Sequence, residues 1–216
     1  MTVRKIPKNY RNVTGVSSHL KANRQAAFES TLERDFYTLL EFDPQVKLFD
    51  VQPLAIYWVD PSGQEHRYTP DVLVVYQDYL KLPSCIFEVK YRKDLITERR
   101  ILLPKIKAAI HYCRTHNMHY KIATERIIRT EACATAKFLL PFLRRAQAYS
   151  AEERILEALS ALRQTTPQTL LSHMSQNTLE QAEILPALWS LIAKRKVGCN
   201  LDKRIHMESE IWHALQ

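Results

Sequence analysis

The chain has 216 residues, of which 46% are hydrophobic and 25% are charged, and only three are glycine. This length accommodates one medium domain or two small ones, and the composition is that of an ordinary globular protein. No run approaches 18 apolar residues and the N-terminus lacks a signal-peptide core, so we expect a cytoplasmic protein that neither spans a membrane nor is secreted. The four cysteines form no CxxC pair, which fits a reducing compartment.

Positive charge is concentrated in residues 1–150, which hold 24 Lys and Arg against 15 Asp and Glu. Residues 151–216 hold 7 against 8. A basic excess on one portion predicts a polyanion partner, most simply nucleic acid, and therefore a protein at the bacterial nucleoid. A modest basic excess without a specific partner is the alternative. Residues 1–26 have no regular period and are predicted to form a basic arm.

The first predicted element is an amphipathic helix that begins near Phe28 and ends near Asp43, because the residue before Pro44 disfavours helix. Four strand-like segments follow, at residues 47–51, 54–59, 65–76 and 84–91. The tetrapeptide DPSG at 60–63 predicts a turn that joins the second and third segments into a hairpin.

A long basic helix is then predicted from about residue 97 to residue 115, followed by a strand at 119–124 and a covering helix at 131–149. Because a helix separates strands 84–91 and 119–124, these two should pair in parallel, so the sheet is mixed. After Tyr149 the pattern changes to three short helices, at 152–163, 167–174 and 179–194, and then a glycine-containing wing. We therefore predict an α/β domain over residues 27–149 and a small winged-helix domain over 150–216.

Two carboxylates and an amine occur where strands are predicted, at Asp71, Glu88 and Lys90. Glu88 and Lys90 are two residues apart, so their side chains leave the same face of a strand, and pairing of neighbouring strands brings Asp71 beside them. Adjacent carboxylates repel each other, and a hard divalent cation removes that conflict. The group therefore indicates metal-dependent phosphodiester hydrolysis, with Mg²⁺ or Mn²⁺ as the cofactor. A surface salt bridge between Glu88 and Lys90 is the structural alternative.

The stretches TPDV and FEVK resemble the PD-(D/E)xK pattern of restriction-endonuclease-like nucleases. The resemblance implies that Asp71 and Glu88 bind the metal, that Lys90 is catalytic, and that an acid on the preceding helix completes the site. Glu33 is the candidate for that acid and a third metal ligand. Ser30 and Glu33 also form a capping-box sequence, so Glu33 has a purely structural interpretation as well.

The order of the basic arm, STLERDFYTLLEFDP, YTPDVLV, FEVKYRKDL, YKIATERII and the trailing wing is similar to the TnsA family of transposon-end endonucleases. This resemblance implies Mg²⁺-dependent nicking of the 5′ strands of double-stranded DNA at transposon ends in Tn7-type cut-and-paste transposition. It also implies two partners, a DDE transposase (TnsB-like) and an AAA+ regulator (TnsC-like). Some members carry Gln at the position of Glu88, whereas this chain has the full carboxylate. RNA-guided and site-directed targeting both stay open.

Basic residues after the ExK motif are candidate DNA-backbone contacts, although a solvated helix face is an equally common use of such residues. They are Arg92, Lys93, Arg99, Arg100 and Lys105. In the C-terminal domain, Glu180 and Glu183 lie early in the third helix, where base contacts would fall. We therefore expect this domain to dock the regulator, with DNA contact through Lys203 and Arg204 left open.

Two other functions compete with this prediction. One is a stand-alone restriction-like or junction-resolving nuclease, which would cut plain duplex without partners. The other is a non-catalytic DNA-binding adaptor with a degenerate nuclease fold, against which the intact set of Asp71, Glu88 and Lys90 argues.

Overall fold

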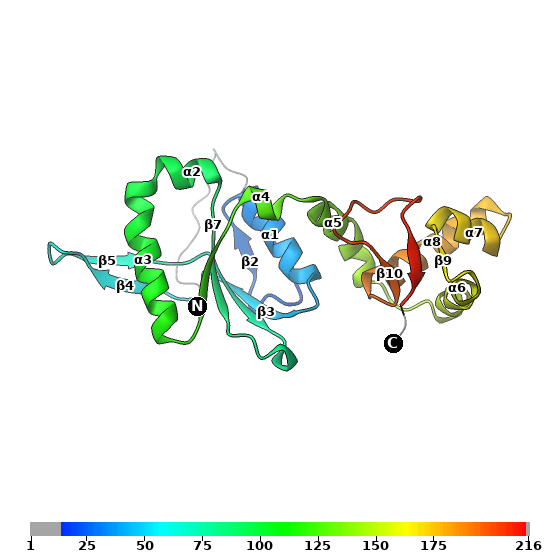
Figure 1. The fold of residues 1–216 in the computed structure, drawn as a ribbon, viewed down its shortest axis with the longest axis horizontal. Coiled ribbons are helices and arrows are strands. Elements are labelled where there is room, and N and C mark those ends of the chain that lie inside the picture. Colours follow the sequence, from blue (N-terminus) through cyan, green and yellow to red (C-terminus); the bar gives the residue numbers. More distant parts are fainter. Residues whose placement is uncertain (1–13, 215–216) are drawn as a thin grey trace. The chain divides into compact units, whose positions relative to one another are not determined.

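A computed structural model describes residues 14–214. The chain divides into two compact units, residues 1–129 and 130–216. Figure 1 shows the helices and strands of the two units, coloured by their position in the sequence. Among the described residues, none of the helices combines the length and the apolar character needed to cross a bilayer.

A four-stranded mixed sheet forms the centre of the first unit. Its strands, in spatial order, are β3 (Val46–Val51), β6 (Val72–Tyr76), β7 (Cys85–Val89) and β8 (His119–Ala123). β6 pairs antiparallel with both β3 and β7, whereas β7 and β8 are parallel. The predicted mixed sheet is confirmed.

Helices flank this sheet on both sides of β7 (Figure 1). α1 (Thr31–Phe42) buries Leu32, Phe36 and Leu40 against the sheet and ends at Asp43, as predicted from Pro44. The crossover between β7 and β8 consists of α2 (Arg92–Thr97) and α3 (Arg99–Thr115), separated by Glu98, instead of one helix. The short 3-10 helix η1 (Asp78–Leu80) and α4 (Glu125–Ile128) complete the unit.

The predicted hairpin is a separate two-stranded sheet of β4 (Ile56–Val59) and β5 (Glu65–Tyr68). In its turn, Asp60 Oδ1 accepts hydrogen bonds from the backbone N–H groups of Ser62 and Gln64, and Gly63 has a positive φ of 85°. The single strand predicted over residues 65–76 is wrong, because β5 and β6 are interrupted at residues 69–71. Pro70 has no N–H to continue a ladder, which explains the break.

The predicted basic arm is only partly described, since residues 1–13 lie outside the described range. Its remaining part is folded: β1 (Gly15–Ser17) pairs antiparallel with β2 (Ala26–Phe28). The buried carboxylate of Glu41 accepts hydrogen bonds from the backbone N–H groups of Leu20 and Lys21, each at 3.0 Å. The arm therefore does not extend to residue 26.

The second unit consists of four helices and a three-stranded antiparallel sheet. The helices are α5 (Glu131–Leu143), α6 (Tyr149–Leu162), α7 (Pro167–Met174) and α8 (Thr178–Ala193). The strands, in spatial order, are β10 (Val197–Cys199), β11 (Ile211–His213) and β9 (Gln164–Thr165). Thr166 caps α7, because its Oγ1 accepts a hydrogen bond from the backbone N–H of Thr169.

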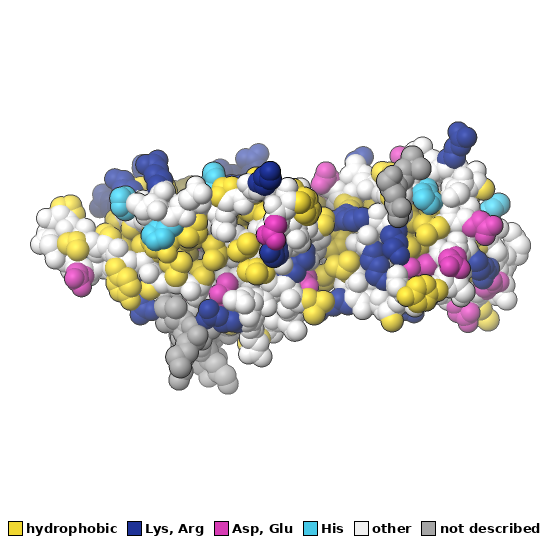
Figure 2. All heavy atoms as spheres, turned by 90° about the horizontal axis from the view of Figure 1, so that it is seen from below, with side chains coloured by type: hydrophobic (Ala, Val, Ile, Leu, Met, Phe, Trp, Pro, Cys, Tyr) yellow, Lys and Arg dark blue, Asp and Glu magenta, His cyan; other side chains and the backbone are white. Residues whose placement is uncertain are grey.

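The structure places the boundary between the units at Arg129, well before the position predicted near Ser150. The reason is the packing of α5, in which Phe138 makes an edge-to-face contact with Trp189 of α8 and Leu139 is fully buried. On the face shown in Figure 2, acidic and basic side chains are mixed over the second unit, at the right.

Candidate active site

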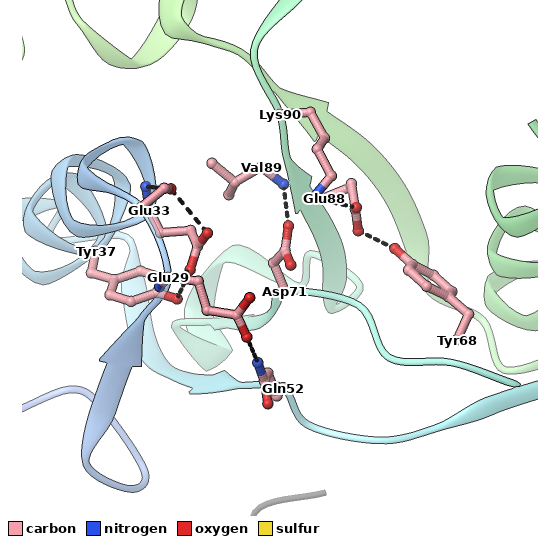
Figure 3. Close-up of polar contacts among 10 residues, drawn as sticks. Glu29, Glu33, Tyr37, Gln52, Tyr68, Asp71, Glu88, Val89 and Lys90 are labelled. Atoms are coloured by element: carbon pink, nitrogen blue, oxygen red, sulfur yellow. Dashed lines mark hydrogen bonds and ion pairs between the residues drawn. The ribbon is translucent and has the colours of Figure 1, made fainter. Parts of the chain in front are cut away.

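Asp71 and Glu88 come together through the register of β6 and β7. Val72 pairs with Phe87 in this antiparallel ladder, so the residue before β6 lies across from Glu88. The backbone N–H of Val89 donates to Asp71 Oδ2 at 2.7 Å, which fixes one of the two carboxylate oxygens. The predicted juxtaposition of these carboxylates is confirmed (Figure 3).

Lys90 and Glu88 leave the same face of the chain, as their spacing predicts. Lys90 Nζ lies 3.3 Å from Glu88 Oε1, and the Tyr68 hydroxyl donates to Glu88 Oε2. Glu88 is only 5% exposed. The alternative of a surface salt bridge on an edge strand is therefore wrong, since Glu88 is buried, only the Lys90 side chain is partly exposed, and β7 lies between β6 and β8.

Burial and the neighbouring charge of Glu88 make the Asp71 carboxylate costly to ionise. Desolvation, followed by the charge of Glu88, raises the pKa of Asp71 well above its usual range. Desolvation lowers the pKa of Lys90, but the charges of Asp71 and Glu88 outweigh it and leave that pKa above its ordinary value. Lys90 is thus a firmly protonated ammonium between two acids.

Glu33 takes part in the cap of α1 and also lines the cleft, so its position is compatible with both interpretations of its sequence context. Its backbone N–H donates to the N-cap Ser30 Oγ at 3.2 Å, while its carboxylate accepts from Ser30 Oγ and from the Glu29 N–H, each at 2.9 Å. The same side chain lines the cleft that holds Asp71. Burial raises its pKa, although the hydrogen bonds from Glu29 and Ser30 oppose that shift.

A cleft of about 380 Å³ opens over these residues. Its lining residues are Glu29, Glu33, Gln52, Arg67, Tyr68, Thr69, Asp71, Glu88, Lys90, Glu98, Leu102 and Lys105. Figure 3 shows Glu33, Asp71 and Glu88 approaching the cleft from α1, the start of β6 and β7. Carboxylates and ammonium groups therefore converge on one hollow from elements far apart in sequence.

The oxygens of Asp71 and Glu88 are a chemically suitable donor set for a hard divalent cation. Within residues 14–214, no group of three or more His, Cys, Asp or Glu side chains is already gathered at metal-ligand spacing. The oxygens of Glu33 in particular are engaged by Ser30 and Glu29. The site therefore fits a metal ion through the carboxylates of Asp71 and Glu88. Glu33 could add a third carboxylate only by giving up its hydrogen bonds with Ser30 and Glu29.

Two family models match the chain in succession. Residues 43–125 match the model for the N-terminal part of TnsA-like endonucleases, and residues 128–201 match that for the C-terminal part of TnsA endonuclease. This chain belongs to the TnsA endonuclease family. Within the TnsA family the chain is a DNA endonuclease of Tn7-type transposition, as the sequence predicts. No curated protein matches the chain.

The junction between the two TnsA models falls within residues 126–127, next to the division of the structure at Arg129. Arg129 closes the first unit by contacting α1: its Nε donates to buried Asp35 Oδ2 at 3.1 Å and its Nη2 to Thr31 Oγ1 at 2.7 Å. The TnsA models and the packing therefore agree on where the nuclease unit ends.

Four of the five basic residues predicted to contact DNA are exposed on α2 and at the start of α3, namely Arg92, Lys93, Arg99 and Arg100. Lys105 is half-buried and lines the cleft, whereas the other four do not line it. The backbone N–H of Arg92 also donates to Glu125 Oε2 at 2.9 Å. Glu125 therefore stabilises the start of α2.

Two residues that line the cleft were not among the candidate site residues predicted from the sequence. Glu29 lines the cleft and its Oε1 accepts a hydrogen bond from Gln52 at 3.3 Å. Tyr68 reaches Glu88 from β5. The alternation of the hairpin places Tyr68 on the same face as Ile56, but no sequence signal shows what its hydroxyl contacts.

Proposed function

We propose that the chain is a Mg²⁺- or Mn²⁺-dependent endonuclease that nicks the 5′ strands at transposon ends. The observation that carries this proposal is the convergence of Asp71, Glu88 and Lys90 in one cleft of a TnsA-family nuclease unit. The DNA substrate is the duplex at the transposon end, and the reaction occurs at the nucleoid.

Asp71 and Glu88 would hold the cation, and Glu33 would join them after exchanging its hydrogen-bond partners. Each of the first two acids has one oxygen fixed by a protein donor, Val89 N–H for Asp71 and the Tyr68 hydroxyl for Glu88. A bound divalent cation supplies positive charge that stabilises a phosphodiester under attack and makes water a better nucleophile. It would also offset the charge of Glu88, which after burial is the next cause of the raised pKa of Asp71.

Lys90 acts first as a cation in this proposal. Its raised pKa keeps the ammonium protonated beside Asp71 and Glu88, so it can hold a phosphate oxygen and offset negative charge at the scissile bond. A cation held by Asp71 and Glu88 would offset their charges, which raise the pKa of Lys90, and Lys90 could then exchange a proton with a water in the cleft.

The basic residues near the cleft would position the duplex. Arg92, Lys93, Arg99 and Arg100 are exposed and suit phosphate contacts, which fix register without reading sequence. Lys105 would bind the phosphate nearest the acids.

The second unit would be a winged helix that docks partners. Its α6, α7 and α8 with β9, β10 and β11 suit that arrangement, the wing being the segment between β10 and β11. Glu180, at the start of α8, forms an ion pair with Arg154 at 3.0 Å. An acidic side chain at this end of the helix does not favour contacts with DNA bases. We assign this unit to a TnsC-like AAA+ regulator and a TnsB-like DDE transposase, with Lys203 and Arg204 free to reach DNA at the wing.

The proposal predicts a change of product when only this cleft is inactivated. If a DDE transposase cuts and joins the 3′ ends independently, Asp71→Ala leaves the 5′ strands attached to the donor. Replication across the branched product then fuses donor and target. In cells that supply all partners, we expect simple insertions to be replaced largely by cointegrates, measured by long-read sequencing across the junctions.

The matched control is Asp78→Ala, which removes an exposed acid paired with Lys47 far from the cleft, and it should give simple insertions. Unchanged simple insertions from Asp71→Ala would mean that another protein makes the 5′ cut.

A further inference from the structure

Tyr68 connects the β4–β5 hairpin to the candidate metal ligand Glu88. Tyr68 pairs with Ile56 in the hairpin, and both side chains are buried in a cluster with Ala109 of α3. The Tyr68 ring is therefore held by packing, while its hydroxyl leaves the cluster and donates to Glu88 Oε2 (Figure 3). A hairpin outside the central sheet thus contributes a fixed donor to the site.

Without such a donor, only the ion pair with Lys90 and the surrounding packing would orient the Glu88 carboxylate, whose terminal torsion is intrinsically broad. The observed contacts assign its two oxygens to different groups, Oε2 to Tyr68 and Oε1 to Lys90 at 3.3 Å. Asp71 has a comparable arrangement, because Val89 N–H holds its Oδ2 at 2.7 Å. Each acid therefore has one oxygen that accepts a hydrogen bond from an uncharged protein donor, and the other oxygen of Glu88 lies beside Lys90.

We propose that Tyr68 is a positioning residue, which orients Glu88 so that the oxygen on the Lys90 side is presented to a divalent cation. This inference rests on the proposed metal-dependent function. Hydrogen bonds to a ligating carboxylate commonly control metal affinity, and their loss weakens affinity or activity by about 10–100-fold. Tyr68 keeps its proton because burial, and then the charge of Glu88, raise its pKa well above the usual value.

The test is the affinity of the full chain for Mn²⁺, measured by calorimetry in the absence of DNA. Tyr68→Phe should bind Mn²⁺ about 10–100-fold more weakly than the unaltered chain. In nicking assays, the Mg²⁺ concentration for half-maximal rate should rise by a similar factor, while the rate at saturating Mg²⁺ is largely recovered. The matched control is Tyr112→Phe, which removes a hydroxyl from a tyrosine in the same cluster, stacked on His116, and should leave affinity unchanged.

A double substitution separates positioning from damage to the fold. Tyr68→Phe leaves a buried carboxylate without the Tyr68 donor, whereas Tyr68→Phe with Glu88→Ala removes the carboxylate together with the hydroxyl. If Tyr68 acts only through Glu88, the double variant binds Mn²⁺ as Glu88→Ala alone does. Weaker binding by the double variant than by Glu88→Ala would show that Tyr68 affects the site independently of Glu88.

Equal or tighter Mn²⁺ binding by a folded Tyr68→Phe chain would overturn the positioning role, because the hydroxyl would then be neutral or a competitor of the metal. Failure of the unaltered chain to bind Mn²⁺ would instead contradict the proposed metal-dependent function. The two failures are therefore distinguishable.

Discussion

Asp71 is a residue whose placement serves the site at the expense of the fold. It is buried across from Glu88, and its pKa is raised by desolvation and by that neighbouring charge. For an acid with a raised folded-state pKa, the folded protein binds the proton more tightly than the unfolded chain does. Stability of the metal-free protein therefore falls as pH rises from the unfolded pKa, about 3.9, through the folded one.

This sign gives a prediction for Asp71→Asn. Asn keeps an oxygen that can accept the Val89 N–H, but it cannot ionise. We expect the variant to unfold at the same temperature as the unaltered chain near pH 4, and at a higher one at pH 8–9 with a chelator present. For a chain of this size, each kcal/mol corresponds to about 2–4 °C. Scanning calorimetry at several pH values measures the difference.

Asp78→Asn is the control, because Asp78 is largely exposed and should show no such trend. A melting difference for Asp71→Asn that shrinks as pH rises would contradict the assigned electrostatics. Added Mg²⁺ should raise the melting temperature of the unaltered chain, because an ion that binds only the folded state stabilises it. It should not raise that of Asp71→Asn, which lacks the carboxylate of a proposed ligand.

At the scale of elements, the sequence predicted most helices and strands, because hydrophobic periodicity and the residues that end helices and strands act locally. Ser30, Pro44 and the DPSG turn set the ends of α1 and the hairpin through backbone chemistry alone. The ExK spacing likewise gave the common face of Glu88 and Lys90. The interruption between β5 and β6 was missed because residues that favour strands lie on both sides of Pro70, with Tyr68 and Thr69 before it and the apolar run 72–76 after it.

The contacts that complete the cleft depend on tertiary packing and could not be predicted from local pattern. Tyr68 and Glu29 come from different elements, and each reaches the site only because the hairpin packs on α3 and α1 follows β2. The position of α5 is a similar case, since its apolar face fits a sheet or a helix equally well in sequence, and α8 is its partner.

The first turn of α1 permits a test that separates capping from catalysis at Glu33. Ser30→Ala removes the N-cap and should cost about 0.5–2 kcal/mol of stability while nicking persists. Glu33→Gln keeps a capping-box residue but removes the charge, so we expect near-normal stability and strongly reduced nicking. Chemical denaturation and a nicking assay on the same preparations measure both. Normal nicking by Glu33→Gln would leave Glu33 a capping residue only.

At the scale of the whole molecule, the boundary at Arg129 predicts which truncation is well behaved. A chain of residues 1–129 keeps the sheet, its helices and the Arg129 contacts with Asp35 and Thr31. A chain of residues 1–149 adds α5 without α8 and exposes the apolar face that carries Cys133, Ala136 and Leu139. We expect the shorter chain to be monomeric and folded, and the longer one to associate or aggregate.

Size-exclusion chromatography with light scattering distinguishes these outcomes. A monomeric 1–149 chain that melts at a higher temperature than 1–129 would place α5 with the nuclease unit instead.

The strand specificity of cleavage tests the central claim most directly. Donor DNA labelled separately on each strand is incubated with the full chain, a DDE transposase, an AAA+ regulator and Mg²⁺, and the strands are resolved on a denaturing gel. We predict that the unaltered chain yields cuts at both strands, and that folded Asp71→Asn yields the 3′-end cuts alone. A 5′-strand cut made at an unchanged rate by Asp71→Asn, or made in the absence of this chain, would contradict the assignment.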